Sequence, residues 1–332
     1  MSGRPILVIT LNPALDVTYP VASLRPGDSH RVTSRLSERA GGKGINVAQV
    51  LHRAGRPVLV TGVVGGDVGA RITTDLDVAG IPQRLVRCAD STRRTVTVVE
   101  TDRAHRATVL NEPGPTITGA EWSSVVDRVT QLLPDVGAVV LTGSLPRGLA
   151  PTTYRELVSL ARAAGRPTVL DTSGPALTAA LEAGPTLVKP NADELAEAAG
   201  AGETSAAAAR LREAGAATVV ASLGAEGLLA LTRDGLWRAR PGLRVEGNPT
   251  GAGDACVAAL ADGLHHGHAL LPTLERAVSW SAGAVAAPTA GEVDPVTAAR
   301  VAELVSVRRE PVTGTWTGDA GSGNDDGSTW WD

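Results

Sequence analysis

The sequence predicts an α/β fold, in which a doubly wound, mostly parallel β-sheet is flanked by helices and carries a small β-sheet as a lid. Short runs of Val, Leu and Ile alternate with Ala- and Leu-rich amphipathic segments along most of the chain. This alternation is typical of parallel strands joined by crossover helices. The runs are continuously apolar, as expected of strands buried on both faces. Two regions, 15–38 and 84–111, instead show short strand-like segments with no helix between them.

The composition is that of a soluble globular protein. At 332 residues, with 43% hydrophobic and 20% charged residues, the chain can bury a sizeable core without a single Phe. The net charge of -4 gives no basic surface for nucleic acid or an anionic membrane. Cys88 and Cys256 are too few for a disulfide framework, and there is neither a signal-peptide layout nor an apolar run of about 20 residues. We therefore expect a cytoplasmic protein with no nucleic-acid or membrane partner.

Each element of the main sheet follows from the alternation. The predicted strands cover 6–11, 57–64, 137–143, 167–172, 186–190 and 217–223. The predicted helices lie near 44–54, 67–79, 118–133, 151–164, 191–214 and 252–264. Because doubly wound sheets bind their ligands at the carboxyl ends of the strands, the functional residues should follow these strands.

The remaining segments complete one domain over residues 1–306. The strands of 15–38 and 84–111 should pair into a small sheet over the carboxyl edge of the main sheet. A further hairpin is expected over 226–241, with Asp234-Gly235 as its turn. The segment 307–332 is rich in Gly, Ser, Asp and Thr and lacks periodicity, so we expect a disordered tail there.

The segment "TGAGD" runs into an Ala-rich helix. The backbone amides of Gly251, Ala252 and Gly253 would then point from the helix N-terminus and form an anion site. Asp254 would lie beside that site, where it could accept the proton of a hydroxyl that attacks a bound phosphoryl group. On these residues alone, Asp254 is explained equally well as a helix-start acid.

A second segment, "GGKGIN", places Lys43 and Asn46 at the start of a helix. It is not a Walker loop, because Gly44 stands where that loop requires Ser or Thr. Lys43 is one of two lysines among 31 basic residues, which suggests a site that needs a compact ammonium group. Asp16, in "TLNPALD", follows the first strand, where it could bind sugar hydroxyls or only form a turn.

The segment "VKPNADEL" brings Lys189 to a strand end and puts Asn191 and Glu194 on the following turn. This polar pair could hold the water shell of Mg²⁺, and it is explained equally well as the capping box of a helix. The segment "ASLGAEG" is a strand followed by a glycine turn, which could form a wall of a nucleotide site.

Together and in this order, the segments resemble the ribokinase-like sugar kinases of the PfkB family, and the resemblance leaves only the tail uncovered. "GGKGINVA" and "NPTGAGDACVAAL" match the two family signatures, and "KPNADEL" contains the N-x-x-E pattern of the family. "TLNPALD" and "TGSLPRGL" further resemble its phosphosugar branch. That branch contains 1-phosphofructokinase, tagatose-6-phosphate kinase and the minor 6-phosphofructokinase.

The resemblance implies roles on the nucleotide side of the site. Asp254 would be the catalytic base, with the amides of Gly251 to Gly253 around the transferring phosphoryl group. Asn191 and Glu194 would organise Mg²⁺ through water. The nucleotide would be lined by Lys189, Ser222, Gly224 and Gly227.

On the acceptor side, the resemblance implies sugar-hydroxyl contacts from Asp16, Gly42 and Asn46. Arg93 matches the position that contacts the phosphate already on the sugar, a task that suits the forked guanidinium group. Lys43 would be its companion. Arg147 departs from the residue that is more usual after "GSLP", and it receives no role.

The resemblance therefore implies an ATP- and Mg²⁺-dependent kinase that converts fructose 1-phosphate to fructose 1,6-bisphosphate. Tagatose-6-phosphate kinase and 6-phosphofructokinase share the motifs and remain alternatives, and a non-catalytic sugar-phosphate or nucleotide sensor is a more remote one. An NAD-dependent oxidoreductase would need a dinucleotide fingerprint that the sequence lacks. Because lids of this family often pair between subunits, the resemblance implies a homodimer, while dependence on a monovalent cation stays open.

Overall fold

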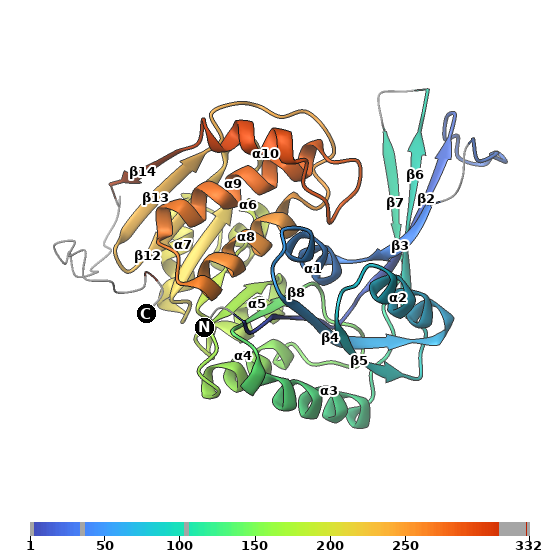
Figure 1. Ribbon diagram of the computed structural model, residues 1–332, viewed down its shortest axis with the longest axis horizontal. Helices are drawn as coiled ribbons and strands as arrows, with labels where there is room; N and C mark the ends of the chain where they lie inside the picture. Colours follow the sequence, from blue (N-terminus) through green and yellow to red (C-terminus); the bar gives the residue numbers. More distant parts are fainter. Residues whose placement is uncertain (1–2, 34–36, 103–105, 312–329, 331–332) are drawn as a thin grey trace.

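The large sheet has ten strands within residues 3–33, 37–102, 106–311 and 330, which are the residues that the computed structural model describes. Their order is β14-β13-β12-β11-β10-β9-β8-β1-β4-β5 (Figure 1). The strands from β11 to β5 pair in parallel, and β12, β13 and β14 extend the sheet in antiparallel pairs. The bounds are β1 (Ile6–Thr10), β4 (Val58–Gly65), β5 (Gln83–Cys88), β8 (Ala138–Thr142), β9 (Thr168–Asp171), β10 (Leu187–Val188), β11 (Thr218–Ser222), β12 (Leu228–Thr232), β13 (Gly235–Arg240) and β14 (Ser306–Glu310).

Helices cover both faces of this sheet, so the sheet separates two apolar cores. One core holds Ile6 and Val8 of β1 and the other holds Leu7 and Ile9, as expected for a strand whose side chains alternate between two buried faces. The helices against the first core are α1 (Lys43–Arg53), α2 (Gly66–Val78), α8 (Ala252–His266), α9 (Leu270–Ala286) and α10 (Pro295–Ala302). Those against the second are α3 (Gly119–Leu132), α4 (Thr153–Ala163), α5 (Gly174–Leu181), α6 (Ala192–Ala199) and α7 (Thr204–Glu213).

A small four-stranded sheet projects from the body (Figure 1). Its strands follow the order β3-β2-β6-β7, and their bounds are β2 (Ala14–Val21), β3 (Ser37–Gly41), β6 (Arg93–Glu100) and β7 (Ala107–Asn111). β2 pairs in parallel with β6, so two distant segments meet in one sheet. The expected small sheet is thus present, but the range 84–111 predicted for its second segment is too wide. β5 overlaps the first residues of that segment and joins the edge of the main sheet beside β4.

Other sequence predictions need correction at their boundaries. The single helix predicted over 191–214 is two helices, α6 and α7, because Gly200 follows α6 with a φ of 84°. The hairpin at 226–241 is present, but its register pairs Thr232 with Gly235, so the turn residues are Arg233 and Asp234. The sequence reading did not identify α5, α9 or α10.

The prediction of disorder from residue 307 onward is wrong for the first residues of that segment. Residues 307–310 belong to β14, which pairs antiparallel with β13. Trp330 is buried, and its indole nitrogen donates a hydrogen bond to the carbonyl of His268. The expectation of disorder otherwise falls on 312–329 and 331–332, which lie outside the described residues. No helix in the described ranges is long and apolar enough to cross a bilayer.

Candidate active site

The N-terminus of α8 lies beside a buried carboxyl group. Gly251 caps the helix with a φ of 91°, and a Cβ at this position would lie 2.8 Å from the Cβ of Ala290, so only glycine fits. Among the described residues, the amides of Gly251, Gly253 and Asp254 have no hydrogen-bond acceptor. The Ala252 amide donates to the carbonyl of Pro249, because a turn precedes the helix. This amide is therefore already paired, whereas the sequence predicts that it is free to bind an anion.

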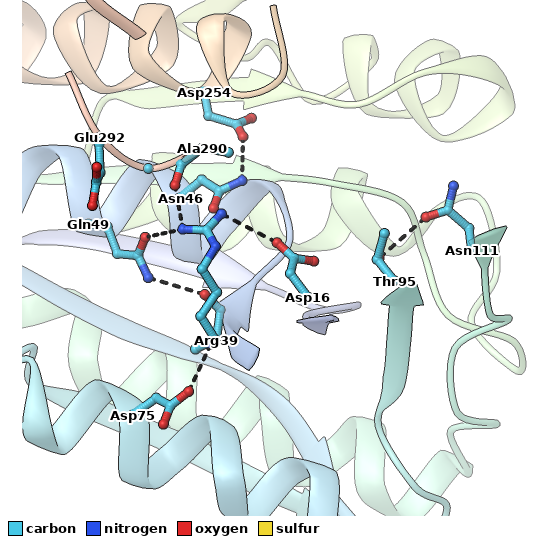
Figure 2. Close-up of polar contacts among 12 residues, drawn as sticks. Asp16, Arg39, Asn46, Gln49, Asp75, Thr95, Asn111, Asp254, Ala290 and Glu292 are labelled. Atoms are coloured by element: carbon cyan, nitrogen blue, oxygen red, sulfur yellow. Dashed lines mark hydrogen bonds and ion pairs between the residues drawn. The ribbon is translucent and has the colours of Figure 1, made fainter. Parts of the chain in front are cut away.

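Asp254 is the third residue of α8 and is 7% exposed. Burial, together with the negative charge of Asp171, raises the pKa of the Asp254 carboxyl to about 7. The Asn46 side chain opposes this shift by donating a hydrogen bond from Nδ2 to Oδ2 of Asp254 at 2.8 Å (Figure 2). A carboxyl group with this pKa can exchange a proton near neutral pH.

Asp171 is the centre of a charged cluster that the sequence reading missed. It ends β9 with 1% exposure, and its carboxylate lies 3.1 Å from Nζ of Lys189 and 3.3 Å from Nζ of Lys43. Burial alone would raise the pKa of Asp171, but the two ammonium groups outweigh it and hold the pKa below its ordinary value. The same pairing outweighs burial for Lys43 and Lys189 and raises their pKa values. Both lysines of the chain therefore contact one buried carboxylate.

This location changes the interpretation of Lys43. Its ammonium group lies toward Asp171 and 3.6 Å from Oε1 of Glu194, and it also lowers the pKa of Asp254. The structure therefore places it with the carboxylates around the helix start. Two cations would be companions only through a phosphate bound between them, so the expected shared role of Lys43 and Arg93 stays a prediction.

Asn191 and Glu194 form a complete capping box at the start of α6. The Glu194 amide donates to Oδ1 of Asn191 at 2.8 Å, and the Asn191 amide donates to Oε2 of Glu194 at 2.9 Å. The structural explanation of this pair is confirmed. It leaves Glu194 Oε1 facing Lys43, so the same turn also presents a carboxylate to the charged cluster.

The predicted nucleotide wall follows β11. A short bridge pairs Ser222 with Asn191, and the Ser222 amide donates to the Pro190 carbonyl at 2.9 Å. Gly224 and Gly227 bound the turn that leads into β12. The turns after β10 and β11 therefore lie side by side at the carboxyl edge of the sheet, as expected from their parallel pairing.

Asp16 lies at the base of the small sheet. On β2 it pairs in register with Arg39 of β3 and with Thr95 of β6. Burial raises the pKa of Asp16, although Arg39, Arg93 and a hydrogen bond from the Gly42 amide oppose the shift. The structure thus brings Asp16, Gly42 and Arg93 together.

Arg93 lines a pocket of about 520 Å³, and a second arginine, Arg147, lines it as well. Arg93 Nε donates to the Asn12 carbonyl at 3.3 Å, whereas the Arg147 side chain has no hydrogen-bond or ion-pair partner among the described residues. The pocket is lined by Asn12, Arg93, Asn111, Glu112, Pro113, Gly114, Ser144, Leu145 and Arg147. Sequence reasoning singled out Arg147 only as a departure from a pattern, and it could not show that this loop faces Arg93.

Comparisons with known proteins identify the family and the fold. The sequence pattern of the pfkB family carbohydrate kinases matches residues 9–296. Phosphofructokinase-2 from Escherichia coli, solved in complex with potassium, is 26% identical with a TM-score of 0.84, and the match covers 90% of this chain and 98% of that one. A possible 1-phosphofructokinase from Thermotoga maritima is 26% identical with a TM-score of 0.83, covering 92% and 99%. Ribokinase from Arabidopsis thaliana, at 18% identity, 90% and 99% coverage and a TM-score of 0.69, shares the fold.

Proposed function

The chain belongs to the pfkB family of carbohydrate kinases, and we propose that it transfers the γ-phosphoryl group of ATP to a hydroxyl of fructose 1-phosphate, forming fructose 1,6-bisphosphate. The observation that carries this proposal is the buried Asp254 carboxyl group, with a pKa of about 7, beside the amides of Gly251 and Gly253, which have no acceptor within the part of the chain that the structure describes. Such a group can accept the proton of the attacking hydroxyl, while the amides stabilise charge on the transferring group.

The cluster around Asp171 suits the phosphates of ATP. Lys189 lies next to the start of α8, since a Cβ on Gly253 would be 3.9 Å from its Nζ. Together with Lys43 it supplies positive charge where phosphoryl transfer needs it. Asp171 keeps both ammonium groups in place and protonated.

Asn191 and Glu194 would hold Mg²⁺ through its water shell. Both offer oxygen atoms, the ligand type that Mg²⁺ prefers, and Oε1 of Glu194 lies at the charged cluster. A hydrated ion tolerates the engagement of the two residues in the capping box. When bound, the ion would neutralise charge on the phosphates. A requirement for K⁺ is open to a direct assay, because the Escherichia coli relative was solved with potassium.

The acceptor would lie between Asp254 and the small sheet. Asp16 and Gly42 would bind its hydroxyls, and Oδ1 of Asn46 is buried with no hydrogen-bond donor among the described residues, so it can accept from another hydroxyl. The existing phosphate would lie in the pocket that Arg93 and Arg147 both line, since guanidinium groups bind phosphate bidentately.

The substrate is tested by a coupled ADP-release assay with fructose 1-phosphate, tagatose 6-phosphate, fructose 6-phosphate and ribose. The proposal predicts the highest kcat/KM for fructose 1-phosphate. A preference for either 6-phosphate would support the alternative kinases, which the phosphofructokinase relatives keep open. Activity on ribose alone would contradict the phosphosugar assignment.

We further propose a homodimer through the small sheet. β7 is exposed along its length, and Val109 and Leu110 are 50% and 59% exposed. Exposed apolar residues on an edge strand favour pairing with a second copy. Sedimentation of the wild type and of Leu110→Asp would test this, with a dimer expected for the first and a monomer for the second.

A further inference from the structure

Arg39 joins two parts of the site that belong to different elements. Its backbone is in β3 of the small sheet, and its guanidinium group lies 3.5 Å from Oδ2 of Asp16. The same group donates to the carbonyl of Ala290 and lies 3.5 Å from Oε1 of Gln49 (Figure 2). The Arg39 side chain is 23% exposed, so these contacts are made largely out of water.

The Ala290 carbonyl belongs to a loop, residues 290–292, that lies against the start of α8. The contact is close, because a Cβ on Gly251 would come within 2.9 Å of Cα of Ala290 and 3.4 Å of the Gly291 nitrogen. The position of this loop therefore decides how much room is left beside the amides of the anion site. Arg39 fixes that position from the acceptor side.

We propose that Arg39 is a positioning residue that couples acceptor binding at Asp16 to nucleotide binding at the start of α8. The proposal rests on the proposed function, because it takes Asp16 as an acceptor ligand. A sugar hydroxyl bound to Asp16 fixes the carboxylate, and thus the guanidinium group and the loop that it holds. A bound acceptor thus tightens nucleotide binding, and by linkage a bound nucleotide tightens acceptor binding by the same factor.

A planar guanidinium group is suited to this task. It directs separate N–H groups at acceptors in different directions, whereas an ammonium group on a flexible stem does not hold two partners in a fixed relation. Lys at this position would keep the charge beside Asp16 and weaken the link to the loop.

Arg53 provides a matched control. It donates to the carbonyl of Gly291, and its guanidinium group lies 3.0 Å from Glu292. It therefore holds the same loop, but from α1 and without contact to Asp16. Replacing Arg53 should loosen the loop without cutting the link to the acceptor.

The test measures the dissociation constant of a non-hydrolysable ATP analogue with and without saturating fructose 1-phosphate. For the wild type, the sugar phosphate should tighten analogue binding about tenfold, a typical coupling between sites. Arg39→Ala should bring the ratio of the two dissociation constants close to one, and Arg39→Lys should give an intermediate ratio. Arg53→Ala should weaken binding of the analogue both with and without the sugar phosphate, while the ratio stays that of the wild type.

A wild-type ratio near one, or a ratio that Arg39→Ala and Arg39→Lys both preserve, would overturn the proposal. If Arg39→Ala does not fold, the ratio of Arg39→Lys decides. Failure of the proposed function is distinguishable, because the wild type would then show no binding of fructose 1-phosphate in the single-ligand titration, whether or not it binds the analogue.

Discussion

The side-chain amide of Asn46 donates a hydrogen bond of 2.8 Å to the carboxylate of Asp254, 208 positions further along the chain. This bond joins the two segments that carry the family signatures, since one residue lies on α1 and the other on α8. It also favours the ionised form of a carboxyl group whose burial disfavours ionisation. Asn46 therefore tunes the residue that we assign as the base.

Removing this bond should shift the pH dependence of the reaction. The base must be ionised to accept a proton, so kcat of the wild type should fall as the pH drops below about 7. In Asn46→Ala the lost hydrogen bond raises the pKa of Asp254 further, and the acidic limb of the profile should move to higher pH. A pH–rate profile of both proteins checks this, and an unmoved limb would contradict the tuning role.

Asp254→Asn should stabilise the fold at alkaline pH. The pKa of Asp254 is about 7 in the folded protein, above its ordinary value of 3.8. The folded state therefore loses stability as the pH rises from about 4 through 7, because burying the charged form is costly. The variant escapes this cost, so its advantage should be on the order of 1–3 kcal/mol at pH 8 and vanish near pH 4. Calorimetric melting across this range would show the trend, and a gap independent of pH would refute it.

Asp171→Asn should destabilise the protein strongly. It leaves Lys189, which is 3% exposed, without its carboxylate partner. Breaking a buried pair in this way costs about 3–5 kcal/mol. Urea unfolding measures the loss, and the exposed Asp193 in the first turn of α6 supplies the control, since Asp193→Asn should change stability by less than about 1 kcal/mol. Equal effects of the two changes would contradict the assigned role of Asp171.

Lys43→Ala should impair the nucleotide side more than the acceptor side. Its ammonium group lies with Asp171 and Glu194 rather than with Arg93. We expect a lower kcat and a larger rise in KM for ATP than for the sugar phosphate. Arg93→Ala should show the opposite, with KM for the sugar phosphate rising by about tenfold or more. Steady-state kinetics with each substrate varied in turn distinguishes the two roles. A larger rise in KM for the sugar phosphate than for ATP in Lys43→Ala would indicate that Lys43 binds the phosphate of the acceptor.

The sequence predicts the central strands well because they are buried on both faces and therefore continuously apolar. The assignment of most of β5 to the small sheet is wrong because this strand is not continuously apolar. It is an edge strand, "QRLVRC", whose polar residues resemble those of the small sheet, and only its pairing with β4 shows where it belongs. Helices α9 and α10 follow one another without an intervening strand, so the strand–helix alternation gave no signal for them.

The site residues were found where a motif carries them and missed where only folding brings them together. Asp171 ends a predicted strand, as a functional residue should, but its sequence, "VLDT", belongs to no motif. The motif containing Lys43 gave no information about which carboxylate its flexible side chain reaches. Arg39 likewise contacts Ala290, 251 positions away, and no local pattern reports such a contact.

The central claim is that Asp254 takes the proton of the acceptor hydroxyl. Rapid-quench measurement of a single turnover of ATP and fructose 1-phosphate at pH 8 tests it most directly, comparing Asp254→Asn with the wild type. We predict a fall in the rate of phosphoryl transfer of about 10²–10⁴-fold, with affinity for an ATP analogue largely unchanged. A variant that transfers the phosphoryl group at a rate near that of the wild type would contradict the claim.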